Sequence, residues 1–418
     1  MLKRVRIILT VLLLLAAVGL DAQVTTASMA GKVTDASNEP IIGATVQAVH
    51  QPSGSRYGTV TNVDGRYSIQ GMRTGGPYRV EISYIGYQTV IYKDITLQLG
   101  EVYNLNVEMS ESSELLNEVI VTAAKTKFTA EKTGATTNIS SAQITQLPTV
   151  NRSISDIARL SPYANGMSFA GGDGRSTNFT IDGANFNNNF GLSSNLPGGG
   201  NPISMDAIEE VQVVVAPFDV RQTNFIGGGI NAITKSGTNT FRGTAYTYYR
   251  NQDMRGNRIN GEDLGARSDE SKTTYGFTLG GPIIKNKLFF FVNYEKEKTP
   301  GEVIKYRARE DGEDAKGMVS RTLKSDMEKV YNHLKDKYGY DAGSYTNFPA
   351  DEENTKLLAR IDWNISKNHK LMVRYNDVKS QDDNLVSGAS TPGGVRLNNA
   401  GRNSINSISF ANTGYKQE

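Results

Sequence analysis

The sequence predicts a mostly β protein in which a small β-sandwich, a mixed α+β domain and the first strands of an outer-membrane β-barrel follow one another. Three observations predict this fold class. The 418 residues include 42 Gly and 20 Tyr but only 38% hydrophobic residues, a composition typical of β proteins. Short segments of alternating polar and apolar residues recur along the chain. In the C-terminal part, tight turns and long polar loops alternate, as in membrane barrels.

The charge balance and the lack of cysteine exclude several classes of protein and site. The chain has 45 basic and 43 acidic residues, whereas nucleic-acid-binding proteins usually carry a basic excess. Because there is no Cys, the chain has no disulfide, no thiolate metal site and no cysteine nucleophile. A length of 418 residues is too great for one hydrophobic core, so several domains are expected.

The sequence has no catalytic or cofactor motif. Its three histidines, His50, His333 and His369, are scattered, and no HExxH, GxSxG, P-loop or GxGxxG pattern occurs. Asp182-Gly183 is more typical of a turn than of a ligand. We therefore expect a protein that is not an enzyme and that uses no metal and no cofactor.

The N-terminus has the features of a signal peptide. A basic start, KRVR at residues 3–6, precedes an apolar run at residues 7–20, which is shorter than the ~20 residues of a membrane-spanning helix. Signal peptidase needs a small residue just before the cut, which predicts cleavage between Ala22 and Gln23. Residues 1–22 are thus expected to be removed after export; the alternative is an N-terminal anchor helix.

Residues 23–110 are predicted to form a small β-sandwich. Short apolar segments alternate with turns such as NEP, PSG and NVDG, which gives about seven strands. Asp64-Gly65 lies between two alternating segments, and this dipeptide is a strong short-range signal for a β-hairpin.

The linker at residues 111–123 contains an apolar strand, in the segment NEVIVTAAK, that is flanked by polar runs. The strand has no sheet of its own to join, and an unpaired strand is a template for strand addition to another protein. An apolar linker without such a role is the alternative. The residues of the strand are Glu118, Val119, Ile120, Val121 and Thr122.

Residues 124–237 are predicted to form a compact α+β domain. Ser153 is positioned to cap a helix whose apolar face carries Ile154, Ile157 and Leu160. A strand and Gly turn in NFTIDGAN follow, then buried strands at residues 211–215 and 230–234. Strands alternating with short helices predict the α+β class.

The Asn-rich segment NFNNNF and a nearby arginine are the candidate ligand contacts of the α+β domain. Loops often carry binding residues, and amides and aromatic rings on such a loop can contact a ligand. An ordinary surface loop is the alternative. The candidates are Arg175, Asn185, Phe186, Asn188 and Phe190.

Residues 238–418 show about six strands with the connections of a membrane barrel. The turns IKNK and SKNH are tight, whereas residues 299–354 and 381–403 form long polar loops. In the strand at residues 356–365, one face is apolar and ends on Trp363 and Ile365, while the other carries Arg360 and Asp362. This alternation suits a sheet with lipid on one side and a polar lumen on the other; a soluble sandwich with one wet face is the alternative.

Several segments resemble known families. GKVTD, PIIGATV, GTVTNVDGRYSI and YRVEISYIGYQT resemble the carboxypeptidase-regulatory-like domain, a transthyretin-like sandwich. NEVIVTA resembles the TonB box of TonB-dependent receptors. VNRSISDIARLSP, NFTIDGANFNNNF and the run from MDAIEEV to TNTFRG resemble the plug and plug-to-barrel junction of the Oar-like branch of these receptors. Gln222-Thr223 is a departure, because a Tyr-Gly pair is usual there.

The resemblance implies a receptor in the cell outer membrane, with the sandwich and the TonB box in the periplasm. The implied partners are TonB, the inner-membrane proteins ExbB and ExbD indirectly, outer-membrane lipid and an extracellular ligand that the sequence does not name. The plug differs from the pattern of the starch-uptake branch, so a surface lipoprotein partner is not favoured. A non-transporting adhesion protein and an export role are the alternatives.

The barrel in this chain is expected to be incomplete. Receptors of this kind resemble barrels of about 22 strands, and closing such a barrel at the spacing seen here takes on the order of 650 residues. We therefore expect the chain to be a fragment or a truncated product.

Overall fold

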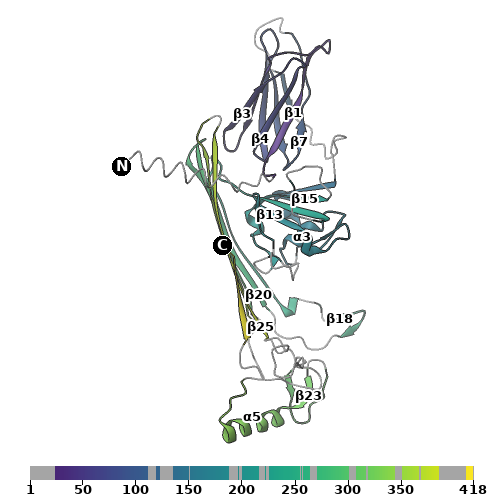
Figure 1. The fold of residues 1–418 in the computed structure, drawn as a ribbon, viewed down its shortest axis with the longest axis vertical. Coiled ribbons are helices and arrows are strands. Elements are labelled where there is room, and N and C mark those ends of the chain that lie inside the picture. The colour runs from purple at the N-terminus through teal and green to yellow at the C-terminus, as the bar shows by residue number, and fades with distance from the viewer. Residues whose placement is uncertain are drawn as a thin grey trace, which may run out of the picture.

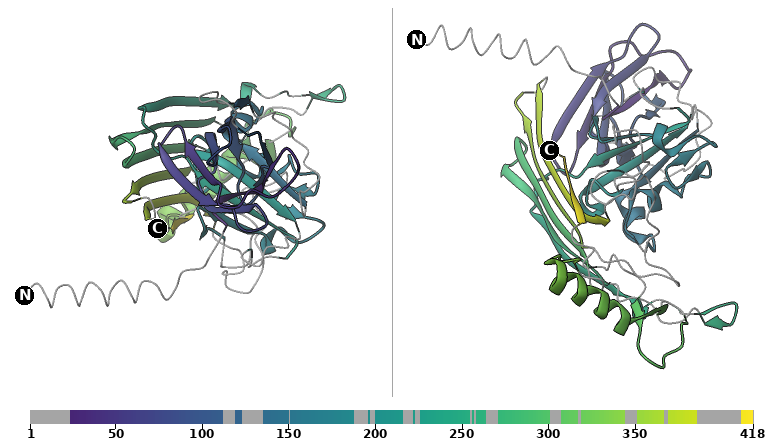
Figure 2. Two further views of the ribbon diagram at one scale, coloured as in Figure 1. Left: turned by 90° about the horizontal axis from the view of Figure 1, so that it is seen from above. Right: turned by 60° about the horizontal axis from the view of Figure 1, so that its bottom comes forward.

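The computed structural model describes residues 24–111, 119–122, 135–149, 151–187, 196, 200–215, 222, 226–254, 256, 258–263, 271–300, 307–316, 319–343, 351–366, 369–385 and 411–417. The sandwich lies at one end, the α+β domain lies below it, and a long curved sheet runs beside that domain toward α5 at the other end (Figure 1). Seen from other directions, the long sheet curves along one side of the α+β domain (Figure 2). The fold is mostly β, as the sequence predicts.

The N-terminal domain is a β-sandwich, as predicted. One sheet has the order β4-β1-β7 with β8 also beside β1, and the other begins β3-β2-β5-β6. Their inward faces form one core that includes Met29, Val46 and Tyr78. The strands are β1 (Ala27–Asp35), β2 (Thr45–His50), β3 (Ser55–Val60), β4 (Arg66–Met72), β5 (Gly75–Ser83), β6 (Val90–Leu97), β7 (Val102–Asn104) and β8 (Val107–Met109).

The turn at Asp64-Gly65 forms, but it does not close a hairpin, and that prediction is wrong. β3 pairs with β2, while β4 pairs with β1 in the other sheet. The side chain of Asn62 accepts hydrogen bonds from the backbone N–H groups of Asp64 and Arg66, at 3.0 and 2.8 Å, and Gly65 has φ of 71°. The turn therefore carries the chain around a corner between the sheets.

The linker strand, β9 (Val119–Thr122), joins the sandwich. It pairs in parallel with β6, which makes it the last strand of a five-stranded sheet ordered β3-β2-β5-β6-β9. The expectation that this strand has no sheet of its own is therefore wrong. Sequence patterns missed the pairing because a parallel neighbour requires no turn signal between the two strands.

The α+β domain is built on a five-stranded sheet ordered β10-β15-β16-β13-β14. Ser153 caps α3 as predicted, because its Oγ accepts a hydrogen bond from the Asp156 N–H at 3.3 Å. Ile154 and Ile157 are buried, whereas Leu160 lies beyond the end of α3 and is 42% exposed, contrary to expectation. The elements are β10 (Ala135–Ser140), α2 (Ser141–Gln146), α3 (Ile154–Ala158), β11 (Ala164–Asn165), β12 (Ser168–Phe169), η2 (Gly174–Ser176), β13 (Asn178–Ile181), β14 (Ala184–Asn185), η3 (Met205–Ala207), β15 (Ile208–Val215) and β16 (Gly228–Thr234).

The C-terminal part forms one antiparallel sheet in which the predicted strands are neighbours in chain order. Residues 285–287 make a tight turn at the end near the sandwich, and the Ser366 N–H donates to the His369 carbonyl at 3.1 Å between the strands that end at Asn364 and begin at Lys370. The described elements of the long connections lie at the other end, as predicted (Figure 1). The strands are β17 (Arg242–Asn251), β20 (Ser271–Ile284), β21 (Leu288–Thr299), β24 (Glu352–Asn364), β25 (Lys370–Leu385) and β26 (Ala411–Gln417).

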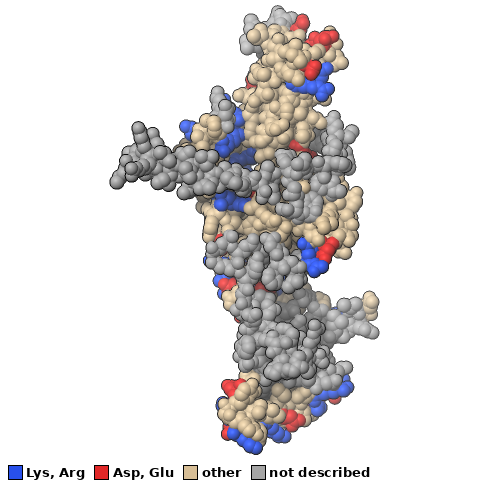
Figure 3. Space-filling model, in the orientation of Figure 1, with Lys and Arg blue, Asp and Glu red and all other residues tan. Residues whose placement is uncertain are grey.

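The long connections carry small elements of their own. Charged side chains of both signs cover the surface around α5 (Figure 3). Among the helices that the structure describes, none combines the length and the apolar character needed to cross a bilayer. The elements are η4 (Gln252–Met254), β18 (Arg258–Ile259), β19 (Glu262–Asp263), β22 (Arg307–Arg309), β23 (Val319–Leu323) and α5 (Lys324–Tyr338).

The two faces of this sheet have the predicted polarity. Ile361 and Trp363 on β24 are each 45% exposed, whereas Arg360 and Asp362 between them are 9% and 6% exposed. The polar face is turned toward the α+β domain, because the Arg360 guanidinium donates to the Thr234 carbonyl at 2.9 Å, whereas Ile361 and Trp363 are exposed on the other face. An apolar outer face around a polar interior is what an outer-membrane barrel requires.

Candidate functional site

The strand predicted to bind a partner protein lies at the edge of the sandwich sheet. Residues 119–122 of β9 have β6 on one side and end the sheet on the other. Glu118, the first predicted residue of this site, lies outside the described part of the chain, as do Ala22 and Gln23 of the predicted cleavage site. The structure thus describes the backbone pairing of the strand but not the whole predicted site.

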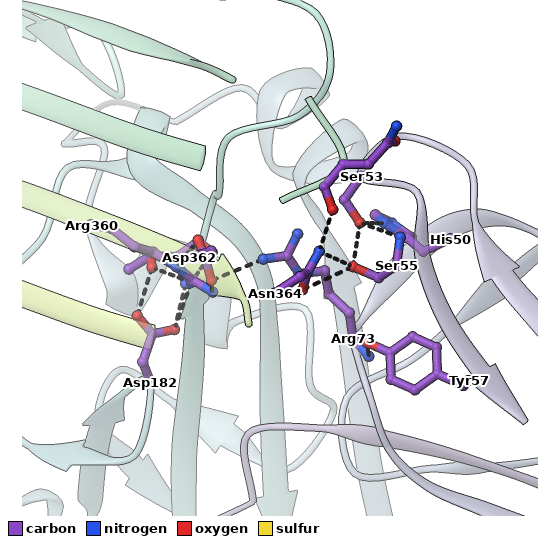
Figure 4. A network of polar contacts seen from close by, with 11 residues as sticks. His50, Ser53, Ser55, Tyr57, Arg73, Asp182, Arg360, Asp362 and Asn364 are labelled. Atoms are coloured by element: carbon purple, nitrogen blue, oxygen red, sulfur yellow. Dashed lines mark hydrogen bonds and ion pairs between the residues drawn. The ribbon is translucent and has the colours of Figure 1, made fainter. Parts of the chain in front are cut away.

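A buried polar network, which we call the three-domain junction, joins the sheet of the barrel to the two other domains (Figure 4). At its centre is Asp182, in the turn between β13 and β14, with a side chain that is only 2% exposed. Its carboxylate lies 2.9 Å from the Arg374 guanidinium and 3.7 Å from that of Arg360. The same carboxylate accepts a hydrogen bond from the Thr234 N–H at 2.8 Å. One carboxylate of the α+β domain, which the sequence resemblance predicts to be a plug, therefore faces two arginines of the long sheet.

The network continues from the barrel to the sandwich through Asp362. Arg360 donates two hydrogen bonds to this carboxylate, both at 2.9 Å, which is the bidentate geometry of a strong pair. Arg73 of the sandwich approaches the same carboxylate at 2.8 Å. Charges of alternating sign therefore run from plug to barrel to sandwich, and removing one of them would leave its neighbours buried without a counter-charge.

A chain of uncharged side chains extends the three-domain junction into the sandwich. The Asn364 amide donates to Ser55 Oγ at 3.1 Å, Ser53 Oγ donates to Ser55 Oγ at 2.9 Å, and His50 Nδ1 lies 2.7 Å from Ser53 Oγ. Burial, with smaller contributions from the positive charges of Arg73 and Lys370, lowers the pKa of His50 to about 3. The imidazole is therefore neutral at physiological pH.

The sandwich also contacts the plug directly, at the loop that contains Leu99. Its N–H donates to Glu210 Oε1 at 3.0 Å, and its carbonyl accepts from the Gln212 amide at 2.6 Å. Asn138 donates to the same Glu210 oxygen at 3.1 Å. Burial raises the pKa of Glu210 to about 7, so this contact holds a carboxyl group that titrates near neutral pH.

A second plug–barrel cluster lies deeper in the barrel. Glu295 of β21 accepts hydrogen bonds from the Ser204 and Tyr246 hydroxyls at 2.8 and 2.9 Å and from the Lys356 ammonium at 2.9 Å. Ser204 belongs to the plug, and the other three residues belong to the barrel. The α+β domain is therefore bound to the long sheet by buried polar contacts, and Phe291 and Leu358 of the sheet also belong to its apolar core.

The candidate ligand contacts of the plug are only partly exposed. Arg175 is exposed and pairs with Asp173, its guanidinium lying 2.9 Å and 2.5 Å from one carboxylate oxygen. Asn185 is exposed in β14, whereas Phe186 is 8% exposed and packs in the plug core. Asn188 and Phe190 lie outside the described residues. Arg175 and Asn185 thus stay available to a ligand, and Phe186 does not.

The residues of the three-domain junction were not singled out by sequence reasoning. Asp182 was interpreted as a turn residue, which it is, but it also binds the barrel. The available signal was the pair of charges Arg360 and Asp362 on the lumen-facing side of a strand. In the part of the chain that the structure describes, His, Asp and Glu side chains form no cluster suited to a metal ion. The arrangement joins three parts of the chain through buried charged and polar side chains.

Comparisons with known proteins agree with this organisation. Residues 28–110 match the carboxypeptidase regulatory-like domain, and residues 233–303 match an outer membrane beta barrel domain. The TonB-dependent transporter Oar of Myxococcus xanthus is 24% identical over 383 residues, covering 85% of this chain and 34% of the relative. The chain thus spans about a third of the length of that curated relative.

Two solved outer-membrane proteins align with part of this chain. The siderophore receptor PirA from Pseudomonas aeruginosa is 16% identical and aligns with 60% of this chain and 38% of its own, with a TM-score of 0.37. The outer membrane transporter YddB from Escherichia coli is also 16% identical and aligns with 60% of this chain and 33% of its own, with a TM-score of 0.42.

Proposed function

We propose that this chain, a TonB-dependent receptor of the outer membrane with an N-terminal carboxypeptidase regulatory-like domain, is part of a transporter. It binds an extracellular ligand and moves it inward with work delivered by TonB. The TonB box is the strand at residues 118–122, and ExbB and ExbD act indirectly through TonB. The outer membrane has no ATP and no ion gradient of its own, so a plugged barrel must receive work from the inner membrane.

The observation that supports this proposal is the position of the box directly before an edge strand of the plug. After β9, the next described element is β10, which lies at the edge of the plug sheet and pairs only with β15 in the described topology. A pull on the box is transmitted along residues 123–134 to Ala135, at one end of the β10–β15 ladder. An edge strand can be peeled away one hydrogen bond at a time, while the remaining strands stay paired.

The polar plug–barrel contacts fit a plug that must move. Asp182 and Glu295 hold the plug through hydrogen bonds and ion pairs, which water can replace once the contact opens. A mainly apolar interface would offer no such replacement. The function proposed here therefore needs both features: a handle before the plug and a plug–barrel interface that can be solvated.

Deleting residues 117–122 tests this function. A strain with this deletion should lose uptake while the receptor keeps its ligand, because the box lies outside the plug and the barrel. A deletion of the same length in the segment that follows the box and precedes β10, residues 125–130, is the matched control and should keep uptake. Growth on a panel of single nutrients identifies the substrate, which then serves as the labelled ligand for the binding assay.

The alternatives give different results in the same experiment. A non-transporting adhesion protein would keep its ligand binding when residues 117–122 are removed, and the cells would grow as before. If the protein exports a product, the deletion should reduce the amount of that product in the medium and leave nutrient uptake unchanged. Either result would contradict the proposed inward transport.

A further inference from the structure

The edge of β6 that faces away from β5 is paired with β9, the strand that we propose to be the TonB box. The register is Val90 to Val119, Ile91 to Ile120, Tyr92 to Val121 and Lys93 to Thr122. Without β9, the edge of β6 would present unpaired N–H and C=O groups, which is the surface that strand addition uses. The structure thus shows the box already engaged in the type of pairing that TonB would require.

The chain is positioned for this pairing before the box begins. The Gln88 N–H donates to the Ser110 carbonyl at 2.9 Å, and Tyr87 forms a β-bridge with Glu111. These contacts hold the end of the sandwich beside the start of β6, so only residues 112–118 separate the anchored chain from β9. A short tether gives the box a high effective concentration at the β6 edge.

One side chain on the outer face of β6 is also covered. Val90 belongs to the sandwich core, so alternation along the strand turns Ile91 to the opposite face. Only 1% of Ile91 is nevertheless exposed. An apolar side chain shielded on the side away from the core supports a packed edge rather than a bare one.

We propose that the edge of β6 is the resting binding site of the TonB box and that TonB must displace the box from it. This inference rests on the proposed coupling to TonB. The carboxypeptidase regulatory-like domain then acts as a competitor built into the receptor: its β6 edge and the open sheet edge of TonB take the same residues, 119–122, and cannot hold them together through the same backbone groups.

The competition should change the apparent dissociation constant of TonB for the receptor. TonB binds only the undocked fraction of the box, so its apparent dissociation constant is the intrinsic one divided by that fraction. If the box is undocked about a tenth of the time, weakening the docking raises the apparent affinity for TonB about tenfold. Lys93→Pro is suited to this test, because the ladder to β5 passes from Tyr92 to Ile95 and skips Lys93. Lys93→Ala is the matched control.

Paired cysteines test the docking itself, since the natural chain contains no Cys. Neighbouring strands lie about 4.8 Å apart, within the Cα separation that a disulfide spans. The receptor in outer-membrane preparations would carry Ile91→Cys with Ile120→Cys, which are register partners. The control carries Ile91→Cys with Val119→Cys, a slip of one residue that places the two side chains on opposite faces. The purified periplasmic domain of TonB is the binding probe.

The expected result is efficient oxidation of the in-register pair, little oxidation of the control, loss of TonB capture in the oxidised receptor and recovery on reduction. Lys93→Pro should bind TonB about tenfold more tightly than Lys93→Ala. Equal oxidation of both pairs, or equal TonB capture by the oxidised and reduced receptor, would overturn the competition. Failure of both the unmodified receptor and Lys93→Pro, in which docking is weakened, to capture TonB would instead refute the proposed function, whereas the disulfide result would still report on docking.

Discussion

Two of the attachments that the sandwich makes differ in kind. At the three-domain junction, side chains do the joining: Arg73 meets Asp362, and Asn364 meets Ser55 (Figure 4). At β6, the backbone of the box does the joining, over residues 119–122. The first attachment depends on the identity of each side chain, whereas the second depends on strand geometry.

This difference indicates which attachment can be exchanged. Opening the junction leaves charges such as Arg73 without their buried partners, which is costly unless water enters. Opening the β6–β9 pair releases backbone groups that form the same hydrogen bonds with any other strand edge. The sandwich is therefore suited to be a fixed base on the barrel, with the box as its removable strand.

The largest expected effect follows from breaking the exchangeable strand. Val119→Pro removes a ladder donor from the box and should abolish uptake, whereas Val119→Ile keeps the strand and should leave uptake unchanged. The measurement is uptake of the labelled nutrient by cells with equal receptor levels. If the two variants transport equally well, strand addition is not the coupling mechanism.

The next largest effect is expected when the three-domain junction loses the Asp362 carboxylate, which Arg360 and Arg73 share. Asp362→Ala leaves Arg360 and Arg73 buried next to each other, and loss of one partner of a buried pair typically costs about 3 to 5 kcal/mol. The receptor should unfold at a lower denaturant concentration and release the sandwich faster under protease. Asp173→Ala is the control, because its ion pair with Arg175 is exposed and should change stability by less than about 0.5 kcal/mol. Equal stability of both variants would show that the junction is not a structural attachment.

A smaller effect is expected on the plug side of the junction. Asp182→Asn keeps the size of the side chain and an acceptor for Thr234, but removes the charge that faces Arg374. The loss should be about 2 to 3 kcal/mol, because hydrogen bonds between charged groups are stronger than neutral ones. A looser plug should admit an antibiotic that is normally too large to cross, measured as increased sensitivity of the cells. Unchanged sensitivity together with unchanged plug stability would contradict this role of Asp182.

The smallest effect is a pH dependence of the fixed junction that comes from His50. The pKa of His50 is lowered from 6.5 to about 3, so the stabilised state is the neutral one. That stability is present above pH 6.5 and is lost as the pH falls toward 3, because an exposed imidazole takes up a proton first. At pH 5 the loss is about 2 kcal/mol.

Protease release of the sandwich at pH 7.5 and pH 5 measures this dependence. The unmodified receptor should release the sandwich faster at pH 5. His50→Asn keeps a polar partner for Ser53 but does not titrate, so its release rate should change less between the two values. The same pH dependence in both proteins would show that another group controls the junction.

Sequence patterns predicted the parts of the fold that depend on local periodicity. Alternation along β24 identified which face carries Trp363 and which carries Arg360, because the side-chain period of a strand is fixed. The cap at Ser153 was predicted for the same local reason. The chain-order arrangement of the six strands also followed from connections that are alternately tight and long.

The sequence could not predict the contacts between segments that are far apart along the chain. Arg73 and Asp362 lie in different domains, and no local pattern shows that they pair. The partner of the box was missed for the same reason, although VIYK in β6 and VIVT in β9 are similar segments that pair in register. Phe186 was expected at a ligand surface because it lies in an Asn-rich segment, but burial in the plug core depends on tertiary packing.

Amide hydrogen exchange in the membrane-embedded receptor, with and without the periplasmic domain of TonB, tests the central contrast most directly. Without TonB, the edge of β6 at residues 90–93 should be protected by the box. Added TonB should remove that protection, while the amide of Asn239, in the segment that leads into β17, should stay protected by its hydrogen bond to the Pro52 carbonyl of the sandwich at 2.8 Å. Rapid exchange at residues 90–93 before TonB is added, or unchanged protection there while the box is bound to TonB, would contradict the exchange of one strand between two edges.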